Sequence, residues 1–414
     1  MPRDGNPWVL IMPNPPPNLR VAIAGGGPAG MMLGFLLARA GIETAVLEKY
    51  PDFFRDFRGD TIHPSTMEVL HELGLLNEFL QLKYNKVSQM NGYIGGQSVP
   101  IGDFSHLKVH CPFIAFIPQW DFLNFIAAQA AKYPSFHLMK ETEVIGLIEE
   151  QGKVIGLRAN TPQGAIELRA ELVVGADGRH STVREKSGLK VVDIGAPMDV
   201  LWFRLSRIPT DPEQALGRID YGKMMVMLDR HDYWQCGFII RKGDFDSIKQ
   251  QGLKAFGDSI RLLSPFLGDR PSEITDWEQV KLLTVTVDHL KIWHRAGLIC
   301  IGDAAHAMSP IGGVGINLAI QDAVAAANIL IPKFGEGKID ESVLAAIQKR
   351  RQWPVRMTQR LQVLIQNRVI ARVLGGSERP KLAWPLHMMR RFPILRRIPA
   401  RIIGMGFRPE HIRH

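Results

Sequence analysis

The chain has 414 residues, of which 46% are hydrophobic and 22% are charged. This length exceeds what one hydrophobic core usually supports, so we expect two domains, and the near-average composition excludes wholesale disorder and collagen-like repeats. The three cysteines, Cys111, Cys236 and Cys300, lie far apart without CxxC spacing. This pattern argues against a disulfide framework or a zinc cluster and favours a cytoplasmic location.

The net charge of +9 is unevenly distributed along the chain. Residues 348–414 contain 16 Lys or Arg and two acidic residues, whereas residues 1–347 contain 34 basic and 39 acidic residues. Basic and apolar residues alternate irregularly at 390–408. This pattern predicts either terminal helices that keep their arginines in water or a contact with an anionic membrane surface. No nucleic-acid motif accompanies the charge, so we expect no nucleic-acid partner.

The amino-terminal region begins with a proline-rich stretch, 1–18, which we expect to be a flexible extension and not a signal peptide. The uncharged stretch 21–38 has the length of a membrane span. Its glycines and proline instead favour a strand, a tight turn and a helix. A second strand at 44–47, ending on Glu48, completes a βαβ unit.

Gly25, Gly27 and Gly30 form a GxGxxG pattern between the expected strand and helix. Glycines at this spacing permit a tight turn, a close approach of the backbone to a pyrophosphate, and packing of the helix on the strand. The helix N-terminus favours negative charge, and Glu48 is spaced to accept hydrogen bonds from ribose hydroxyls. The pattern therefore predicts a site for one adenine dinucleotide. The sequence has no second fingerprint of this kind.

The next segments predict helices and strands in alternation. Ser65 and Glu68 are expected to form a capping box ahead of an amphipathic helix. Strands are expected within 92–118, a helix at 120–132, and a meander of strands at 143–174.

Two further motifs follow, GADGRHSTVR at 175–184 and GDAAHAMSPIGGVGINLAIQDA at 302–323. With the glycine pattern they resemble the fingerprints of the flavin-dependent aromatic hydroxylases, the class A single-component monooxygenases typified by para-hydroxybenzoate hydroxylase. The resemblance covers about residues 20–345 and implies a resident FAD with NAD(P)H as a transient co-substrate. It also implies attack of O2 to give a flavin C4a-hydroperoxide and oxygen transfer to an aromatic, phenol-like or polyketide-like substrate.

The resulting prediction for the fold is α/β: an FAD-binding Rossmann-like domain interleaved with a β-sheet substrate domain, plus C-terminal helices. The expected segments are an extension at 1–18, a first FAD-binding part at 19–190 with substrate-facing strands at about 92–118, a substrate domain at 191–287, a second FAD-binding part at 288–345, and a basic helical segment at 346–414.

The resemblance also implies which residues surround the cofactor. Asp303 would bind the ribityl chain, and Asp177 would be structural for the FAD site. Pro310, Gly312 and Gly313 would flank the flavin ring, and no side chain is assigned as an acid or a base. The predicted cofactor-binding set is Gly25, Gly27, Pro28, Ala29, Gly30, Glu48, Lys49, Arg58, Gln119, Asp177, Gly302, Asp303, Gly315, Ile316 and Asn317.

Two histidines, His63 and His306, are interpreted as packing or FAD-shell residues, because no second ligand lies at metal spacing and we expect no metal. Cys300, on an expected buried strand, is interpreted as inert.

The substrate wall is expected to come from the β-sheet domain, although ordinary core packing would explain the same residues. If they form the wall, the lack of an obvious cationic cluster favours a bulky apolar phenol or polyketide over a small carboxylate. The candidates are Tyr221, Met225, Met227, Tyr233 and Gln235.

Other classes stay open at this stage. They are a flavin-linked prenyl-chain reductase, a flavin-dependent halogenase, whose WxWxIP signature is missing, and a GDI-like binding module without enzymatic activity. We expect a monomer or a homodimer, with peripheral membrane contact as one role for the basic C-terminal segment.

Overall fold

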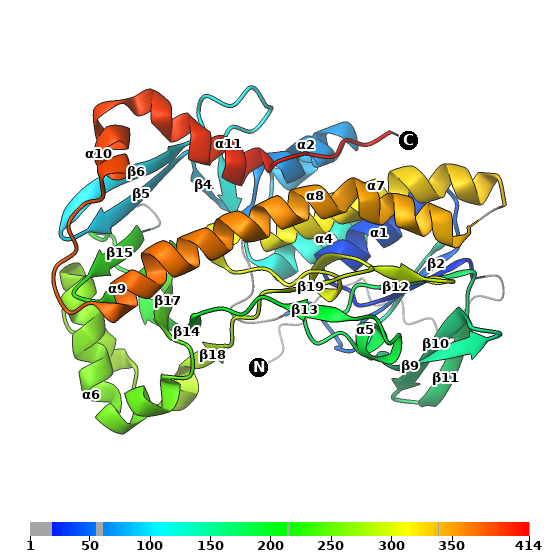
Figure 1. Ribbon diagram of the computed structural model, residues 1–414, viewed down its shortest axis with the longest axis horizontal. Coiled ribbons are helices and arrows are strands. Elements are labelled where there is room, and N and C mark those ends of the chain that lie inside the picture. Colours follow the sequence, from blue (N-terminus) through cyan, green and yellow to red (C-terminus); the bar gives the residue numbers. More distant parts are fainter. Residues whose placement is uncertain (1–18, 55–60, 213–215, 338, 414) are drawn as a thin grey trace.

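The structure is a computed structural model that describes residues 19–54, 61–212, 216–337 and 339–413 (Figure 1). The predicted extension at 1–18 and the predicted cofactor ligand Arg58 lie outside the described residues.

A six-stranded sheet organises one half of the molecule. Its strands run parallel, except that the edge strand of residues 294–295 is antiparallel to its neighbour. The stretch 21–38 forms a buried strand, a turn and a helix, so the predicted βαβ unit is confirmed. In pairing order the strands are β20 (His294–Arg295), β21 (Leu298–Cys300), β12 (Leu172–Gly175), β1 (Val21–Ala24), β2 (Thr44–Leu47) and β8 (Phe136–Met139).

Helices cover one face of this sheet, because their apolar residues recur at helical spacing and join one core cluster with the sheet. These helices are α1 (Pro28–Arg39), α2 (Pro64–Glu72), α3 (Leu76–Phe79), α4 (Gln119–Ala130), α7 (Gly315–Gly335) and the start of α8 (Glu341–Ile365).

A meander of three strands covers the other face and forms a second core cluster. It corresponds to the first part of the meander predicted at 143–174, whereas the last predicted strand is β12 of the six-stranded sheet. Its elements are β9 (Glu143–Glu150), β10 (Lys153–Thr161), β11 (Gly164–Arg169) and the adjoining short helix α5 (Thr182–Lys186).

A seven-stranded sheet forms the other half of the molecule. Its last two strands come from the early chain, so the two halves are interleaved as the sequence predicts. In pairing order the strands are β18 (Lys281–Leu283), β14 (Met198–Ser206), β17 (Tyr233–Arg241), β16 (Lys223–Asp229), β15 (Leu216–Asp220), β5 (Gln89–Ile94) and β6 (Gln97–Asp103).

Two smaller sheets connect these halves. The strands expected at 92–118 divide between sheets, because only the part up to residue 103 joins the seven-stranded sheet. In one of the smaller sheets, β7 (Ile114–Phe116) lies between β3 (Thr61–Ile62) and β4 (Asn85–Val87); in the other, β13 (Val191–Asp193) pairs with β19 (Asp288–Leu290).

The two faces of the seven-stranded sheet have different partners. Side chains alternate between the faces along each strand. One face packs against α6 (Phe245–Leu263), and the other packs toward α8, the residues after it and Ile311. Short helices connect these parts: η1 (Pro265–Leu267), η2 (Arg270–Glu273), η3 (Trp277–Gln279), η4 (Gly302–Ala304) and η5 (Ile311–Gly313).

The C-terminal segment joins the two halves. In Figure 1, α8 runs diagonally from the six-stranded sheet to the seven-stranded sheet, and the chain then turns back over β6 toward α2. Its further elements are a π-helical turn η6 (Gln366–Ile370), α9 (Ala371–Gly375), α10 (Trp384–Arg391), η7 (Pro393–Arg396) and α11 (Arg397–Met405). The predicted C-terminal helices are therefore confirmed.

Within the described residues, the stretch Ile311–Gly335 is long and apolar enough to cross a membrane, and 72% of its apolar window is buried inside the protein. Core helices of globular proteins pass the same test. In this fold the stretch contains α7, which packs against α1 and α8.

Candidate cofactor site

Three sequence motifs meet at the carboxyl ends of β1, β12 and β21. A Cβ atom added to Gly25 would overlap the Ala176 carbonyl and lie 2.7 Å from Asp177 Cα. A Cβ on Gly302 would lie 3.0 Å from the Cβ of Ala29 in α1. The glycines are therefore required for the close approach of the three motifs.

The N-terminus of α1 is open toward this junction. Gly27 is the N-cap and Pro28 occupies the first turn, where its missing N–H costs nothing. A Cβ added to Gly27 would meet no atom of the described residues within 4 Å. Gly27 also has an ordinary backbone conformation, with φ of −77°. The described protein itself therefore gives no reason for glycine here, whereas a bound phosphate group would.

Glu48 lies at the end of β2, directly beside the glycine turn. Its Oε2 accepts a hydrogen bond from the Gly26 N–H at 3.0 Å, and its Oε1 accepts one from the Tyr50 N–H at 3.1 Å. Glu48 is thus fixed beside the glycine turn by two backbone N–H groups, at the position expected for a ribose ligand. Lys49 is exposed and lies over the Tyr50 ring.

The Asp177 carboxylate binds other residues of the second motif. It accepts hydrogen bonds from the Ser181 hydroxyl and, at 3.1 Å, from the Val183 N–H. Burial raises the pKa of Asp177, and these hydrogen bonds oppose the rise. Ser181 in turn caps α5. The carboxylate is thus used for holding the loop, as expected of a structural residue.

Asp303 keeps its carboxylate accessible within the third motif. Its side chain is 31% exposed, and its Oδ2 lies 3.6 Å from Nη2 of Arg179 in the second motif. This ion pair connects the second and third motifs across the site. The motif spacing alone gave no sign of the pairing.

The segment 310–317 leads from the third motif into α7. Gly313 has φ of +62°, and a Cβ there would overlap the Thr61 hydroxyl, which donates to the Gly313 carbonyl at 2.8 Å. Gly312 also has positive φ, and a Cβ on Gly315 would meet nothing within 4 Å. The N-terminus of α7 is therefore open like that of α1. Pro310 precedes these glycines as the N-cap of η5.

Asn317 differs from its predicted role. Its Oδ1 accepts from the His63 N–H and the Thr66 hydroxyl, and its Nδ2 donates to the carbonyls of Thr61 and Gly313. These four contacts use the full capacity of an amide side chain. The side chain therefore joins α7 to α2 and β3. Only its backbone N–H, in the first turn of α7, is left for a cofactor. The neighbouring Ile316 is buried in the core.

His63 is completely buried at the start of α2. Its Nδ1 contacts the Ile403 carbonyl of α11 at 2.7 Å, while Nε2 has no hydrogen-bond partner among the described residues. Burial lowers its pKa to about 4, and the contact with Ile403 only partly opposes this. The ring is neutral near pH 7, which fits a packing role. Gln119 is the first residue of α4 and is half-buried.

A buried ionic network that motif matching did not find lies behind the third motif. His306 Nε2 lies 2.5 Å from Asp322 Oδ2, which also accepts from the Gly302 N–H at 3.1 Å. Arg351 Nε donates to Asp322 Oδ1 at 2.8 Å and its Nη1 reaches Glu410 at 3.3 Å. We call these four side chains, His306, Asp322, Arg351 and Glu410, the cofactor-side network. Asp322 lies within the third motif, but no local pattern marks Glu410 as its indirect partner.

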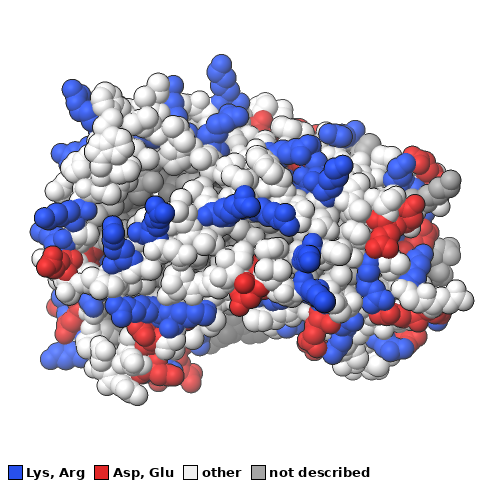
Figure 2. Space-filling model, viewed as in Figure 1, with Lys and Arg blue, Asp and Glu red and all other residues white. Residues whose placement is uncertain are grey.

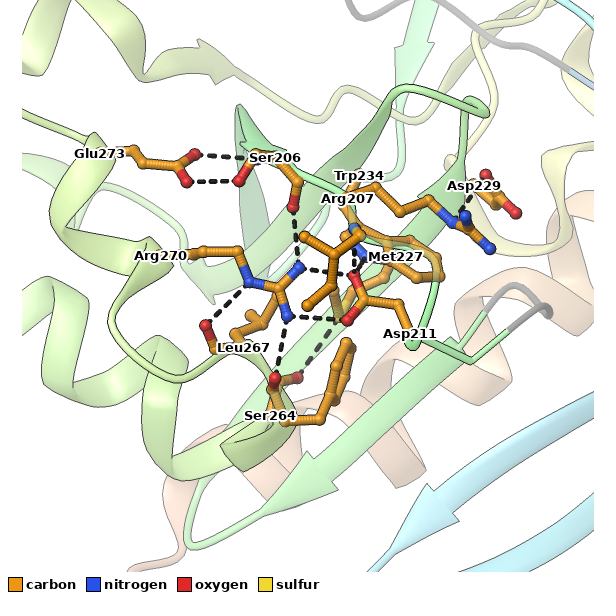
Figure 3. A network of polar contacts seen from close by, with 12 residues as sticks. Ser206, Arg207, Asp211, Met227, Asp229, Trp234, Ser264, Leu267, Arg270 and Glu273 are labelled. Carbon is orange, nitrogen blue, oxygen red and sulfur yellow. Dashed lines mark hydrogen bonds and ion pairs between the residues drawn. The ribbon is translucent and has the colours of Figure 1, made fainter.

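The predicted substrate wall divides between the two faces of the seven-stranded sheet. Met225 and Met227 are completely buried in the core beneath α6, and Met227 Sδ accepts from the Ser264 hydroxyl at 3.3 Å (Figure 3). Their prediction as wall residues is therefore wrong, because strand alternation turns them away from Ile311. Their neighbours Met224 and Val226 pack with the Ile311 cluster instead.

The other three candidates lie in two different places. Tyr233 and Gln235 share the face that carries Met224, as the strand register requires. Tyr221 is 40% exposed in the turn between β15 and β16, with Arg379 of the C-terminal segment over its ring. Cys300 is completely buried, which raises its pKa and fits the expected lack of reactivity.

The fold brings the three motifs together in the arrangement expected for one dinucleotide. A sequence family described as FAD binding domain matches residues 18–360, and the chain belongs to this family. The chain is 30% identical over 386 residues to a 6-methylpretetramide 4-monooxygenase of Streptomyces rimosus, covering 92% of this chain and 91% of that protein.

Two other similarities extend this picture. A rifampicin monooxygenase of Rhodococcus hoagii is 26% identical over 73% of this chain, and the match spans 62% of that longer relative. The crystal structure of p-nitrophenol 4-monooxygenase from Pseudomonas putida superposes with a TM-score of 0.72 at 22% identity, covering 94% of this chain and 99% of that one.

The protein is therefore an FAD-dependent monooxygenase, and NAD(P)H is the reductant typical of its family. The open helix N-termini at Gly27 and Gly315, the position of Glu48 beside the glycine turn and the accessible Asp303 fit an FAD.

Proposed function

We propose that the enzyme hydroxylates a polycyclic phenol of the polyketide type. The similarity to a 6-methylpretetramide 4-monooxygenase over nine-tenths of both chains carries this proposal. The alternatives of a prenyl-chain reductase, a halogenase and a GDI-like module have no comparable support in the residues.

We assign the three motifs to the parts of FAD as follows. The N-terminus of α1 would hold the pyrophosphate, Glu48 the adenosine ribose and Asp303 the ribityl chain. Pro310, Gly312 and Gly313 would flank the flavin, toward which α7 would direct its positive end. When bound and reduced, FAD supplies the activation of O2. The chain's own residues hold the cofactor, orient the substrate and exclude water.

The face of the seven-stranded sheet that packs with Ile311 supports the substrate class. Trp202, Met224 and Val226 lie there half-buried in one apolar cluster with Ile311. A flat, largely apolar ring system fits such a surface, because aromatic and thioether side chains contact ring faces favourably. These residues replace Met225 and Met227 as our candidates for the substrate wall.

The same face carries positive charge farther along, which corrects the expectation that no cationic cluster is present. Arg204 lies over the Tyr233 ring, and the buried Arg230 donates to Gln235 at 3.1 Å. Arg230 also lies within electrostatic range of Asp121 in the first turn of α4, whose pKa is raised by burial and partly lowered by Arg230. A phenolate or enolate oxygen of the substrate would be stabilised at this polar end.

The test is a screen of NAD(P)H oxidation by the FAD-loaded enzyme with polycyclic phenols, simple phenols and benzoates. We expect stimulated oxidation and a product heavier by one oxygen with a polycyclic phenol. Stimulation by simple benzoates alone would contradict the proposed substrate class. Asp303→Ala should weaken FAD retention. Full flavin content after gel filtration would contradict the assignment of Asp303.

We also propose that the C-terminal segment docks on an anionic membrane surface. Trp384 is 72% exposed and Ile394 and Ile398 are about 60% exposed. The exposed Arg390, Arg391, Arg397 and Arg401 are their neighbours in the sequence, and residues 379–409 contain no acidic residue. Exposed apolar side chains interspersed with arginines suit the interface of an anionic bilayer.

Vesicle sedimentation tests this contact. The enzyme should bind vesicles with phosphatidylglycerol more strongly than vesicles of phosphatidylcholine alone, and Trp384→Ser/Ile398→Ser should lose most of the binding. Equal recovery of the wild type and the double variant in the supernatant would contradict the proposed membrane contact. The cytoplasmic location, the monomer or homodimer and the domain boundaries at 190, 287 and 345 stay predictions.

A further inference from the structure

A basic groove lies on α8, outside the site described above. It has a volume of about 560 Å³ and runs between α8 with its π-helical turn η6 and residues near the β13–β19 pair. Arg356, Arg360 and Arg368 line it together with His289 and Asn367. In Figure 2, a row of Lys and Arg side chains crosses the face over α8, while most acidic side chains gather toward the two ends.

The arginines of this groove are available for a ligand. Their side chains are exposed, and none of the three has a carboxylate partner among the described residues. Arginines elsewhere in the described chain, such as Arg184 and Arg270, are paired with buried aspartates. Three unpaired guanidinium groups around one hollow repel one another, so an anion bound between them would relieve an unfavourable arrangement.

The other groups of the groove favour an organic anion over a simple ion. His289 adds an imidazole ring to the lining of the groove. Asn367 adds an amide, and Ile194 and Leu364, which are 40% and 50% exposed, supply an apolar wall. Guanidinium forks bind phosphate in a bidentate manner, and an apolar wall accommodates the remainder of a phosphorylated molecule.

The groove is also connected to the flavin-flanking segment. Gln359 on the same helix donates to the carbonyl of Ala307 at 3.1 Å, and Gln362 donates to those of Ser309 and Ile311 at 3.0 and 2.9 Å. A ligand on α8 therefore binds to the helix that fixes residues 307–311. In addition, the single GxGxxG pattern is already committed to one dinucleotide, so NAD(P)H must bind elsewhere.

We propose that the α8 groove binds the phosphate groups of a small molecule, either the pyrophosphate of NAD(P)H or a free anion of the pyrophosphate type. The NAD(P)H source rests on the proposed monooxygenase reaction, whereas the anion site itself does not.

Calorimetric titration of the FAD-loaded enzyme with pyrophosphate tests the site without any turnover. The test variant is Arg356→Gln/Arg360→Gln, and the matched control is Lys349→Gln/Lys254→Gln. The control removes the same charge from exposed positions outside the groove, Lys349 on the same helix and Lys254 on α6. Surface substitutions of this kind usually leave stability almost unchanged, which FAD content and circular dichroism would verify.

Wild type and control should bind pyrophosphate, more weakly at high salt, and the arginine variant should bind it about tenfold more weakly or worse. A parallel rise of about tenfold in KM for NAD(P)H, with kcat nearly unchanged, would identify the co-substrate as the source. Loss of pyrophosphate binding with an unchanged KM would identify a free anion. No pyrophosphate binding by wild type, or equal binding by the arginine variant and the control, would overturn the proposal.

Discussion

Two ionic networks, each centred on a buried aspartate, hold the two halves of the molecule in different ways. The cofactor-side network connects residues from 302 to 410, because Asp322 binds the Gly302 N–H on one side and Arg351 on the other. Arg351 then reaches Glu410 near the end of the described chain. The loop that carries Asp303 is thus held indirectly by the C-terminal tail.

The second network lies on the α6 side of the seven-stranded sheet and is shown in Figure 3. Arg270 contacts Asp211 through two hydrogen bonds of 2.5 and 2.8 Å, and the Trp234 indole N–H donates to Asp211 at 2.8 Å. Ser206 and Glu273 add a further link. We call these five residues the sheet-side network. Its members span only residues 206–273, and none belongs to the three motifs.

The difference shows where a buried charge can influence the cofactor. Each network leaves its aspartate ionised against the cost of burial. Burial alone would raise the pKa of both aspartates. Contacts with His306 and Arg351 outweigh burial and lower the pKa of Asp322. Contacts with Arg270 and Trp234 do the same to the pKa of Asp211. Only the cofactor-side network also touches a cofactor loop. We therefore expect substitution of either aspartate to lower the free energy of unfolding, but only substitution of Asp322 to weaken FAD binding.

The largest effect is expected for Asp322→Asn. It removes the carboxylate shared by His306 and Arg351 and leaves the buried Arg351 with Glu410 as its remaining acidic partner among the described residues. Breaking a buried ion pair costs about 3–5 kcal/mol. The Gly302 N–H also loses a charged acceptor, so FAD content should fall. Urea unfolding and the flavin absorbance after gel filtration measure the two effects. Normal FAD content in a destabilised variant would contradict the coupling.

The two faces of the sheet offer the next comparison, through Met225→Ala and its neighbour Met224→Ala. Met225 is completely buried against the α6 core, so truncation should cost about 2–5 kcal/mol of unfolding free energy with KM for the aromatic substrate unchanged. Met224 is half-buried beside Ile311, so its truncation should change KM more than stability. A change in KM for Met225→Ala and a mainly destabilising effect for Met224→Ala would show that the substrate lies on the α6 side of the sheet.

Asp211→Asn should destabilise the protein by about 2–3 kcal/mol, because a charged hydrogen-bonding group is lost from Arg270. Its FAD content should equal that of wild type, in contrast to Asp322→Asn. Loss of flavin from the folded Asp211 variant would mean that the halves are coupled by a route other than the C-terminal tail. The same unfolding and absorbance measurements apply.

The smallest expected effect is a dependence of stability on acid pH. An aspartate with a lowered folded-state pKa contributes stability that is present above its unfolded pKa of about 4 and is lost as the pH falls through the folded value. Unfolding free energies between pH 7 and pH 3 should therefore decline, and less steeply in Asp322→Asn and Asp211→Asn than in wild type. Equal slopes in all three proteins would contradict the assigned pKa directions.

The sequence was sufficient to predict the convergence of the three motifs. Parallel strands end at the same edge, so Gly25, Asp177 and Asp303 had to lie near one another once β1, β12 and β21 were recognised. It could not identify which face of β16 is covered by α6. Strand alternation puts Met224 and Met225 on opposite faces of the sheet, but it does not indicate which of the two faces a helix that is distant in sequence.

Two residue patterns in the sequence form contacts in the fold that differ from the predicted ones. The predicted capping box of Ser65 and Glu68 does not form, because Pro64 occupies the first turn and makes His63 the N-cap, while Glu68 binds His110. Asn317 matches the third motif, yet its side chain is taken by protein partners that become neighbours only in the fold.

The variant Gly27→Val examines whether the motif junction is shaped around one FAD. A Cβ atom at this position meets no described protein atom within 4 Å, so the apoprotein should lose only about 1 kcal/mol, as for a poorer N-cap. Fluorescence titration with FAD should show binding to wild type and to the control Gly146→Val, which lies in β9 with similar open space. Folded Gly27→Val should bind no FAD, and FAD binding at wild-type affinity would mean that the α1 N-terminus does not hold the cofactor.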